Sequence, residues 1–322
     1  MNDLLVALTP ISFLGFIVLI GYCIEKTGFV TNINEKLSKL ILHVTLPALV
    51  ITSISSQRFL NTSYWDMLYI VIIGVVAIFG LLILNFGVAR ILRVKKDHRL
   101  IHAYLGSFGN VIFLGYPFIY ILFGDIGLFY AIIFSIVNDM ILWTFGVYFL
   151  HRGSNLACSD RMTAKRLILP FLNPNTISFL LGMSKLLLKI QLPEIIHAPL
   201  SSIGSTTTPL SMLFIGAILA KMDLKEAAKN IPIWWVCMLK MVLFPMSIIF
   251  ILRFCFSMLI DTHQILFSVA ILQIAMPTQV ILSVLADRYN ADTKYVTQTI
   301  FITTLVSIIT LPFVYYLCLK LV

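Results

Sequence analysis

Long apolar stretches separated by short polar breaks dominate the sequence. Ten such stretches lie near residues 5–24, 37–56, 66–89, 100–123, 127–150, 171–190, 196–220, 231–253, 264–286 and 295–319. A helix needs about 20 apolar residues to cross the hydrocarbon core of a bilayer. The pattern therefore predicts an all-α polytopic membrane protein with ten transmembrane helices.

Composition agrees with this interpretation. Of the 322 residues, 60% are hydrophobic and 11% are charged, whereas soluble domains average about 45–50% apolar and about 25% charged residues. A soluble core cannot hide that much apolar surface, so we expect the lipid bilayer to surround the chain. The net charge of +9 arises from short basic clusters between the apolar stretches. Such clusters are typical of membrane topology signals, and no nucleic-acid partner is expected.

The distribution of basic residues predicts an orientation. Seventeen of the 23 Lys and Arg residues fall on one side of the ten-helix map and five on the other, while Lys240 lies inside a stretch. Because basic loops stay in the cytoplasm, we expect a multi-pass protein of the plasma or inner membrane. Both termini would be extracellular or periplasmic, and the polar segment 151–169 would be a cytoplasmic loop.

The chain also divides into two weakly similar halves, 1–150 and 170–322, joined by the loop 151–169. Glycines and prolines recur at offsets of 160 to 162 residues: Gly21 with Gly182, Pro47 with Pro209, and Pro117 with Pro277. Chance alignment of so few residues is the alternative explanation. If the repeat is real, an odd number of crossings in each half makes it an inverted repeat, an architecture common in secondary transporters.

Helix-breaking residues cluster in the fourth and ninth stretches. The fourth contains Gly106, Gly109, Asn110, Gly115 and Pro117, and the ninth contains Gln273, Pro277 and Gln279. Proline removes a backbone donor and interrupts a helix, and backbone groups freed inside a membrane must find partners or line a wet cavity. Two matched breaks predict a binding site at the midplane. Simple kinks, with glycines allowing close packing, are the alternative.

Few other polar residues interrupt the apolar stretches. Asn138 and Asp139 lie near the centre of the fifth stretch, and Lys240 lies near the middle of the eighth. An intramembrane charge is costly and usually faces a cavity or an opposite charge. These residues are candidates for a substrate site, and a structural Asp139–Lys240 pair is the alternative.

Signals for other chemistry are missing from the sequence. The five cysteines are scattered without CxxC spacing, so we expect neither a disulfide nor a metal site. No GxSxG, HExxH, Walker A or GxGxxG motif occurs. We therefore expect no enzyme activity, no cofactor and no direct use of ATP.

Several motifs resemble the auxin efflux carrier family, which includes bacterial malate permeases. They are Ile20-Gly21-Tyr22, Lys26-Thr27-Gly28, Leu46-Pro47-Ala48-Leu49, the run from Gly109-Asn110 to Gly115-Tyr116-Pro117, Ala275-Met276-Pro277-Thr278, and Thr303-Thr304-Leu305-Val306-Ser307 with Pro312. The resemblance implies two inverted five-helix repeats whose fourth and ninth helices break at prolines and cross near the substrate. The long cytoplasmic loop of plant members is only 151–169 here, which favours malate or another small carboxylate over auxin.

The favoured hypothesis is therefore a secondary carrier of a small organic anion. Its candidate site residues are Gly109, Asn110, Pro117, Asn138, Asp139, Lys240, Gln273, Pro277 and Gln279. A sodium-coupled solute symporter of the bile-acid type is the main alternative, and a membrane-embedded sensor is the third. The sequence leaves open whether a proton or sodium ion is coupled and whether the chain forms a homodimer.

Overall fold

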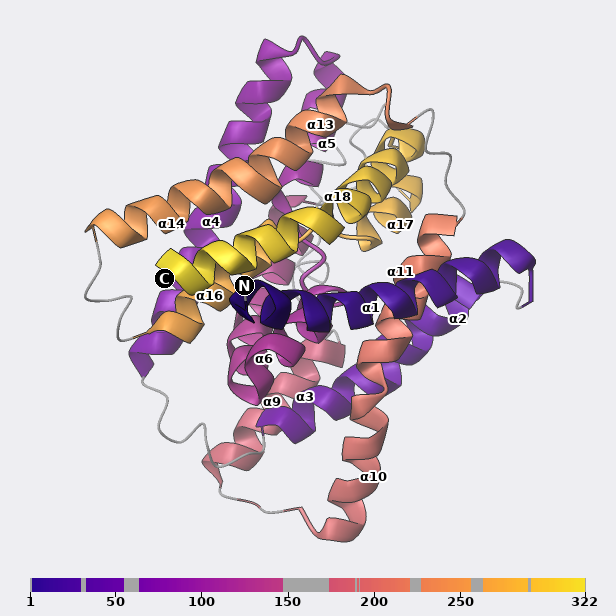
Figure 1. The fold of residues 1–322 in the computed structure, drawn as a ribbon, viewed down its shortest axis with the longest axis vertical. Coiled ribbons are helices and arrows are strands. Elements are labelled where there is room, and N and C mark those ends of the chain that lie inside the picture. The colour runs from indigo at the N-terminus through magenta and orange to yellow at the C-terminus, as the bar shows by residue number, and fades with distance from the viewer. Residues whose placement is uncertain are drawn as a thin grey trace.

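The computed structural model describes residues 2–29, 33–54, 64–146, 174–188, 190, 192–220, 227–255, 263–288 and 291–321, and the regular structure in these ranges is helical (Figure 1). The first half contains α1 (Asn2–Thr27), α2 (Ile33–Leu40), η1 (Ile41–Thr45), α3 (Leu46–Ile54), α4 (Tyr64–Ile91), α5 (Lys96–Ser107), α6 (Gly115–Ile141) and η3 (Leu142–Gly146). The second contains α9 (Pro174–Leu187), α10 (Glu194–Ser205), α11 (Thr207–Ala220), α13 (Ile231–Met238), η5 (Leu239–Leu243), α14 (Phe244–Cys255), α16 (Gln264–Ala275), α17 (Ile281–Arg288) and α18 (Thr293–Leu321). The segments η1, η3 and η5 are single π-helical turns that continue neighbouring α-helices.

Six helices in the described part of the chain are long and apolar enough to cross a membrane. They are Lys36–Ile54, Trp65–Ile91, Gly115–Phe145, Glu194–Ala220, Ile231–Cys255 and Thr293–Lys320. Large apolar side chains such as Val76, Ile83 and Ile309 are 64%, 71% and 76% exposed. Apolar surface of this extent is costly in water, and it suits helices whose outer faces contact lipid.

Each of the ten apolar stretches overlaps at least one described helix. The seventh contains a single-residue turn at Thr206 between α10 and α11, and the fourth and ninth contain longer interruptions. The fourth stretch is divided between α5 and the start of α6, with the segment 108–114 outside any helix. The ninth is divided between α16 and α17 by the segment 276–280. Within α6, Gly124 has φ 63° and ψ −152°. This conformation is readily available only to glycine, and it separates the fourth stretch from the fifth.

Helices from the two halves pack directly against each other, as α1 does against α11 and α18 (Figure 1). Glycines permit the closest of these contacts. A Cβ atom on Gly216 would overlap the carbonyl oxygen of Val18, and one on Gly21 would overlap that of Leu213. The backbones of α1 and α11 therefore approach at a distance that only glycine allows. The connecting loop 151–169 lies outside the described residues, so the predicted boundary between the halves stays a prediction.

Candidate functional site

The two interruptions meet in the interior of the protein. The backbone N–H of Asn110 donates to the carbonyl oxygen of Pro277 at 2.7 Å, and that of Gln279 donates to the carbonyl oxygen of Phe108 at 3.2 Å. These bonds form an antiparallel bridge with Gly109 opposite Thr278. We call the segments 108–114 and 276–280 together the crossing. Each interruption thus provides hydrogen-bond partners for backbone groups of the other that have none within their own helix, as an apolar environment requires.

Four helix ends point at the crossing. The helices α5 and α16 end there, while α6 and α17 begin there. The first turn of a helix has backbone N–H groups without intrahelical partners and a partial positive charge. Such ends favour anionic groups. The first-turn N–H groups of α6 already donate to backbone carbonyl oxygens, as those of Gly115 and Tyr116 do to Asn110 and Ile112 at 3.0 and 3.3 Å. The starts of α6 and α17 therefore bring positive helix ends to the crossing.

Two threonines, one within the crossing and one on α18, stabilise the crossing through hydrogen bonds. The hydroxyl of Thr278 donates to the carbonyl oxygen of Leu105 at 3.0 Å, and its backbone N–H donates to Oγ1 of Thr303 at 3.1 Å. Thr303 lies on α18 and is fully buried. Sequence reasoning did not select Thr278 or Thr303 as site residues. Both belong to motifs that resemble the family, but a motif does not reveal contacts between residues so far apart in the chain.

Lys240 binds the end of α5. It lies in the π-helical turn η5, is completely buried, and its Nζ donates to the carbonyl oxygen of Phe108 at 2.6 Å. The last carbonyl oxygens of a helix have no intrahelical partner, and a lysine side chain near the helix C-terminus can donate to them. The ammonium group is thus positioned by the crossing, whereas the sequence suggested Asp139 or an anion as its partner.

Asn138 and Asp139 connect α6 to the second interruption. The side-chain amide of Asn138 donates to Oε1 of Gln279 at 3.3 Å and to Oδ1 of Asp139 at 3.4 Å. All three side chains are buried. The structure therefore brings three of the predicted site residues into one hydrogen-bonded group beside the crossing.

Two other amides at the crossing keep unused hydrogen-bonding capacity. Asn110 is 1% exposed, and within the described residues neither its Oδ1 nor its Nδ2 has a partner. Gln273 donates to the carbonyl oxygen of Val111 at 3.5 Å, but its buried Oε1 has none. An unsatisfied buried polar group costs about 1–3 kcal/mol, and most such groups in native proteins have a partner. These amides are the strongest candidates for contact with a ligand.

The two prolines occupy different positions. Pro277 lies within the second interruption and supplies the carbonyl oxygen that binds Asn110. Pro117 lies in the first turn of α6, after the irregular segment 108–114 has ended. Proline fits the first turn of a helix because its missing N–H would have no intrahelical partner there. The resemblance implied a break at both prolines, but in the fourth stretch the interruption precedes Pro117 and contains Gly109 and Asn110.

Three buried polar groups outside the crossing were not predicted. Tyr116 hydrogen-bonds Ser135 and Asn175, which joins α6 to α9. Tyr130 donates to Asp66 at 3.1 Å, and Nδ1 of His263 lies 2.9 Å from the same carboxylate. Nδ1 of His102 lies 2.7 Å from the hydroxyl of Tyr295. Each group joins distant parts of the sequence, so the order of residues alone does not indicate it.

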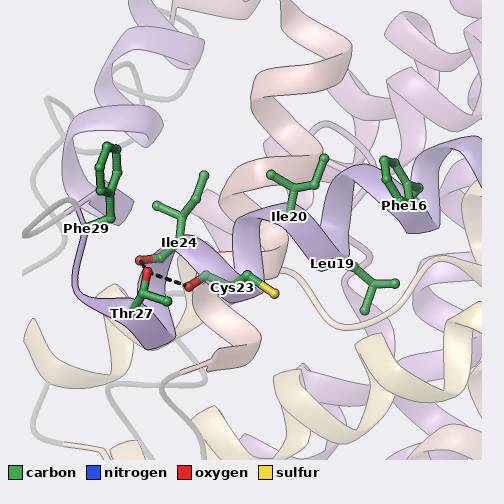
Figure 2. A pocket seen from close by; sticks show the side chains of 7 residues that line it. All are labelled: Phe16, Leu19, Ile20, Cys23, Ile24, Thr27 and Phe29. Atoms are coloured by element: carbon green, nitrogen blue, oxygen red, sulfur yellow. Dashed lines mark hydrogen bonds between the residues drawn. The ribbon is translucent and has the colours of Figure 1, made fainter.

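A cavity of about 630 Å³ beside α1 is lined mainly by apolar side chains, unlike the crossing with its buried amides (Figure 2). It is lined by Phe16, Leu19, Ile20, Cys23, Ile24, Thr27 and Phe29. The hydroxyl of Thr27 already donates to the carbonyl oxygens of Cys23 and Ile24, at 2.9 and 3.1 Å. The cavity therefore offers apolar surface and no charged group, which suits lipid chains and not an anion. Among the described residues, no group of three or more His, Cys, Asp or Glu side chains could hold a metal ion.

Comparison with known proteins assigns the chain to a protein family. Residues 6–315 match the family of membrane transport proteins that includes the auxin efflux carriers. The chain belongs to this family. It is 25% identical over 305 residues to an uncharacterized transporter of Methanocaldococcus jannaschii, covering 91% of this chain and 92% of the relative. It is 24% identical over 302 residues to an uncharacterized transporter of Methanothermobacter thermautotrophicus, covering 92% and 93%. The protein is a membrane transporter, as the resemblance predicted.

Proposed function

We propose that this transporter is a secondary carrier of a small organic anion, such as malate or another small carboxylate. The unpaired, buried side chain of Asn110 carries the proposal. Its Nδ2 can donate to a carboxylate, and the starts of α6 and α17 add positive helix ends. Gln273 and the group formed by Asn138, Asp139 and Gln279 complete the polar surroundings.

The proposed carrier has ten transmembrane helices in two inverted repeats. Two segments related by a two-fold axis in the membrane plane run in opposite directions, and the antiparallel bridge between Gly109 and Thr278 supports such a relation. Gly21 with Gly182 and Pro47 with Pro209, at offsets of 161 and 162 residues, support it independently, whereas Pro117 and Pro277 occupy different positions relative to the interruptions. In this conformation Asn110, Gln273, Thr278 and Lys240 are all buried. A substrate can reach them only if the helices around the crossing move, as alternating access requires.

Uptake by proteoliposomes tests the substrate class. Purified protein would be reconstituted and given labelled malate, other small carboxylates and an uncharged analogue, each with and without proton and sodium gradients. The proposal expects uptake of at least one carboxylate and none of the uncharged analogue. Uptake that requires sodium would favour the symporter of the bile-acid type, and transport of only uncharged solutes would refute an anion carrier.

The proposed orientation has its own test. In a cysteine-free background, Ser154→Cys should resist an impermeant thiol reagent in intact cells, because position 154 would lie in the cytoplasmic loop. Labelling after the membrane is permeabilised provides the control for reactivity. Labelling of Ser154→Cys from outside intact cells would overturn the proposed orientation. The proposed substrate class does not depend on this result.

A further inference from the structure

A second polar pocket lies away from the crossing. Its volume is about 720 Å³, and it is formed where the turn between α4 and α5 meets the starts of α13 and α18. The charged and titratable residues that line it are Arg93, Lys95, His98, Lys229, Asp292, Lys294 and Tyr295. None of them belongs to the candidate substrate site, so the pocket requires a separate explanation.

Positive charge dominates this pocket. Four of its side chains are Lys or Arg and only one is a carboxylate. That carboxylate, Asp292, already has partners: its Oδ1 accepts the backbone N–H of Tyr295 at 3.0 Å, and its Oδ2 lies 3.7 Å from Nδ1 of His98. Like charges collected around one concave surface create a strong local potential that attracts anions.

Ordered turns hold the basic residues around the pocket. Arg93 has φ 54°, a left-handed conformation that residues other than glycine rarely adopt. Backbone bonds from Arg93 to Arg90 (3.1 Å) and from Val94 to Ala89 (2.9 Å) maintain this turn. The turn that carries Lys229 is held by Nε1 of Trp234, which donates to the carbonyl oxygen of Ala228 at 2.9 Å.

Apolar surface adjoins the basic residues. Leu92, Val94, Ile231 and Pro232 also line the pocket, and Ile231 is 65% exposed. Trp234 and Trp235, 41% and 43% exposed, follow on α13, and tryptophan is enriched where membrane meets water. A ligand that fits this surface has an anionic head and an apolar body.

We propose that this pocket binds the phosphate group of an anionic phospholipid. Lys and Arg recognise phosphate through charge-assisted hydrogen bonds, and basic pockets between membrane helices bind acidic lipid headgroups. The pocket is lined by residues of α5, α13 and α18. Beyond the pocket, α5 leads into Phe108, α13 continues into η5 with Lys240, and α18 carries Thr303, which all take part in the crossing. A bound lipid would therefore bridge the outer ends of helices that meet at the substrate site.

Direct binding measurements test the proposal without a transport readout. The purified full-length protein in neutral detergent would be titrated with dioctanoyl phosphatidylglycerol, dioctanoyl phosphatidylcholine or inorganic phosphate, and native mass spectrometry would count the bound molecules. The test variant is Lys95→Gln with Lys229→Gln. The control is Lys26→Gln with Lys36→Gln, which removes the same charge from exposed residues outside the pocket.

Phosphatidylglycerol should bind the wild type more tightly than phosphatidylcholine. Each basic residue near an anionic lipid contributes about 1 kcal/mol, so the test variant should lose affinity about 30-fold. The control variant should keep wild-type affinity, and Lys95→Arg with Lys229→Arg should bind as the wild type does. Equal affinity in the wild type and the glutamine test variant would overturn the proposal. Binding of inorganic phosphate without phosphatidylglycerol would overturn the lipid assignment and indicate a soluble phosphate compound.

Discussion

Replacing Asn110 by leucine separates stability from function at the crossing. Leucine has nearly the shape of asparagine but no polar atoms. In the described structure the Oδ1 and Nδ2 atoms of Asn110 are buried without partners, and each such atom costs about 1–3 kcal/mol. Asn110→Leu removes both unpaired atoms, but leucine packs imperfectly in a site shaped for asparagine, which offsets part of the gain. The net increase in the free energy of unfolding should be about 1–3 kcal/mol. The substitution should also abolish tight substrate binding.

Asn85 provides a matched control. It is fully buried on α4, but its Nδ2 donates to the carbonyl oxygens of Leu81 and Gly106 at 2.9 and 3.2 Å. Asn85→Leu removes both bonds, but it also removes Oδ1, which like that of Asn110 is buried without a partner within the described residues. The loss of two hydrogen bonds offsets the relief of one unpaired atom. Asn85→Leu should therefore stabilise the protein less than Asn110→Leu does, by about 1–3 kcal/mol.

Thermal unfolding and uptake would be measured on the same preparations. A change of 1 kcal/mol shifts the midpoint of a mid-sized domain by about 2–4 °C, so the difference between the two variants is measurable. Asn110→Leu should raise the midpoint and reduce the initial uptake rate per folded protein by about tenfold or more, as expected when a hydrogen bond to a charged group is lost. A lowered midpoint with normal uptake would refute the argument that Asn110 is kept unpaired for a ligand.

Three further predictions concern contacts in and near the crossing. Lys240→Gln should reduce uptake about tenfold, because the carbonyl oxygen of Phe108 loses its lysine donor and an unsatisfied buried group costs about 1–3 kcal/mol; rescue by Asp139→Asn would contradict this assignment. Pro277→Ala should impair uptake more than Pro117→Ala, since only Pro277 lies within an interruption; equal rates would count against it. Tyr295→Phe should lower the free energy of unfolding by about 1–3 kcal/mol, because buried His102 loses its partner; an unchanged unfolding midpoint would disprove this.

The sequence was sufficient to predict an all-helical membrane protein and the two regions in which the fourth and ninth stretches are interrupted, whereas the count of ten transmembrane helices stays a prediction. Apolar stretches of about 20 residues have few alternatives to helices in a membrane, and each predicted stretch overlaps a described helix. The cluster from Gly106 to Pro117 and the residues around Pro277 marked the two interruptions, because glycine and proline act on the local backbone. The family assignment followed from the same motifs.

Tertiary structure alone decided which groups satisfy one another. Lys240 binds a carbonyl oxygen 132 residues away in the chain, and Thr278 binds Leu105 across 173 residues. Backbone carbonyls are present at every residue, so no sequence pattern identifies the one that a distant lysine will reach. Likewise, Asn85 and Asn110 look alike in the sequence, and only packing makes the first a structural donor and leaves the second unpaired at the crossing.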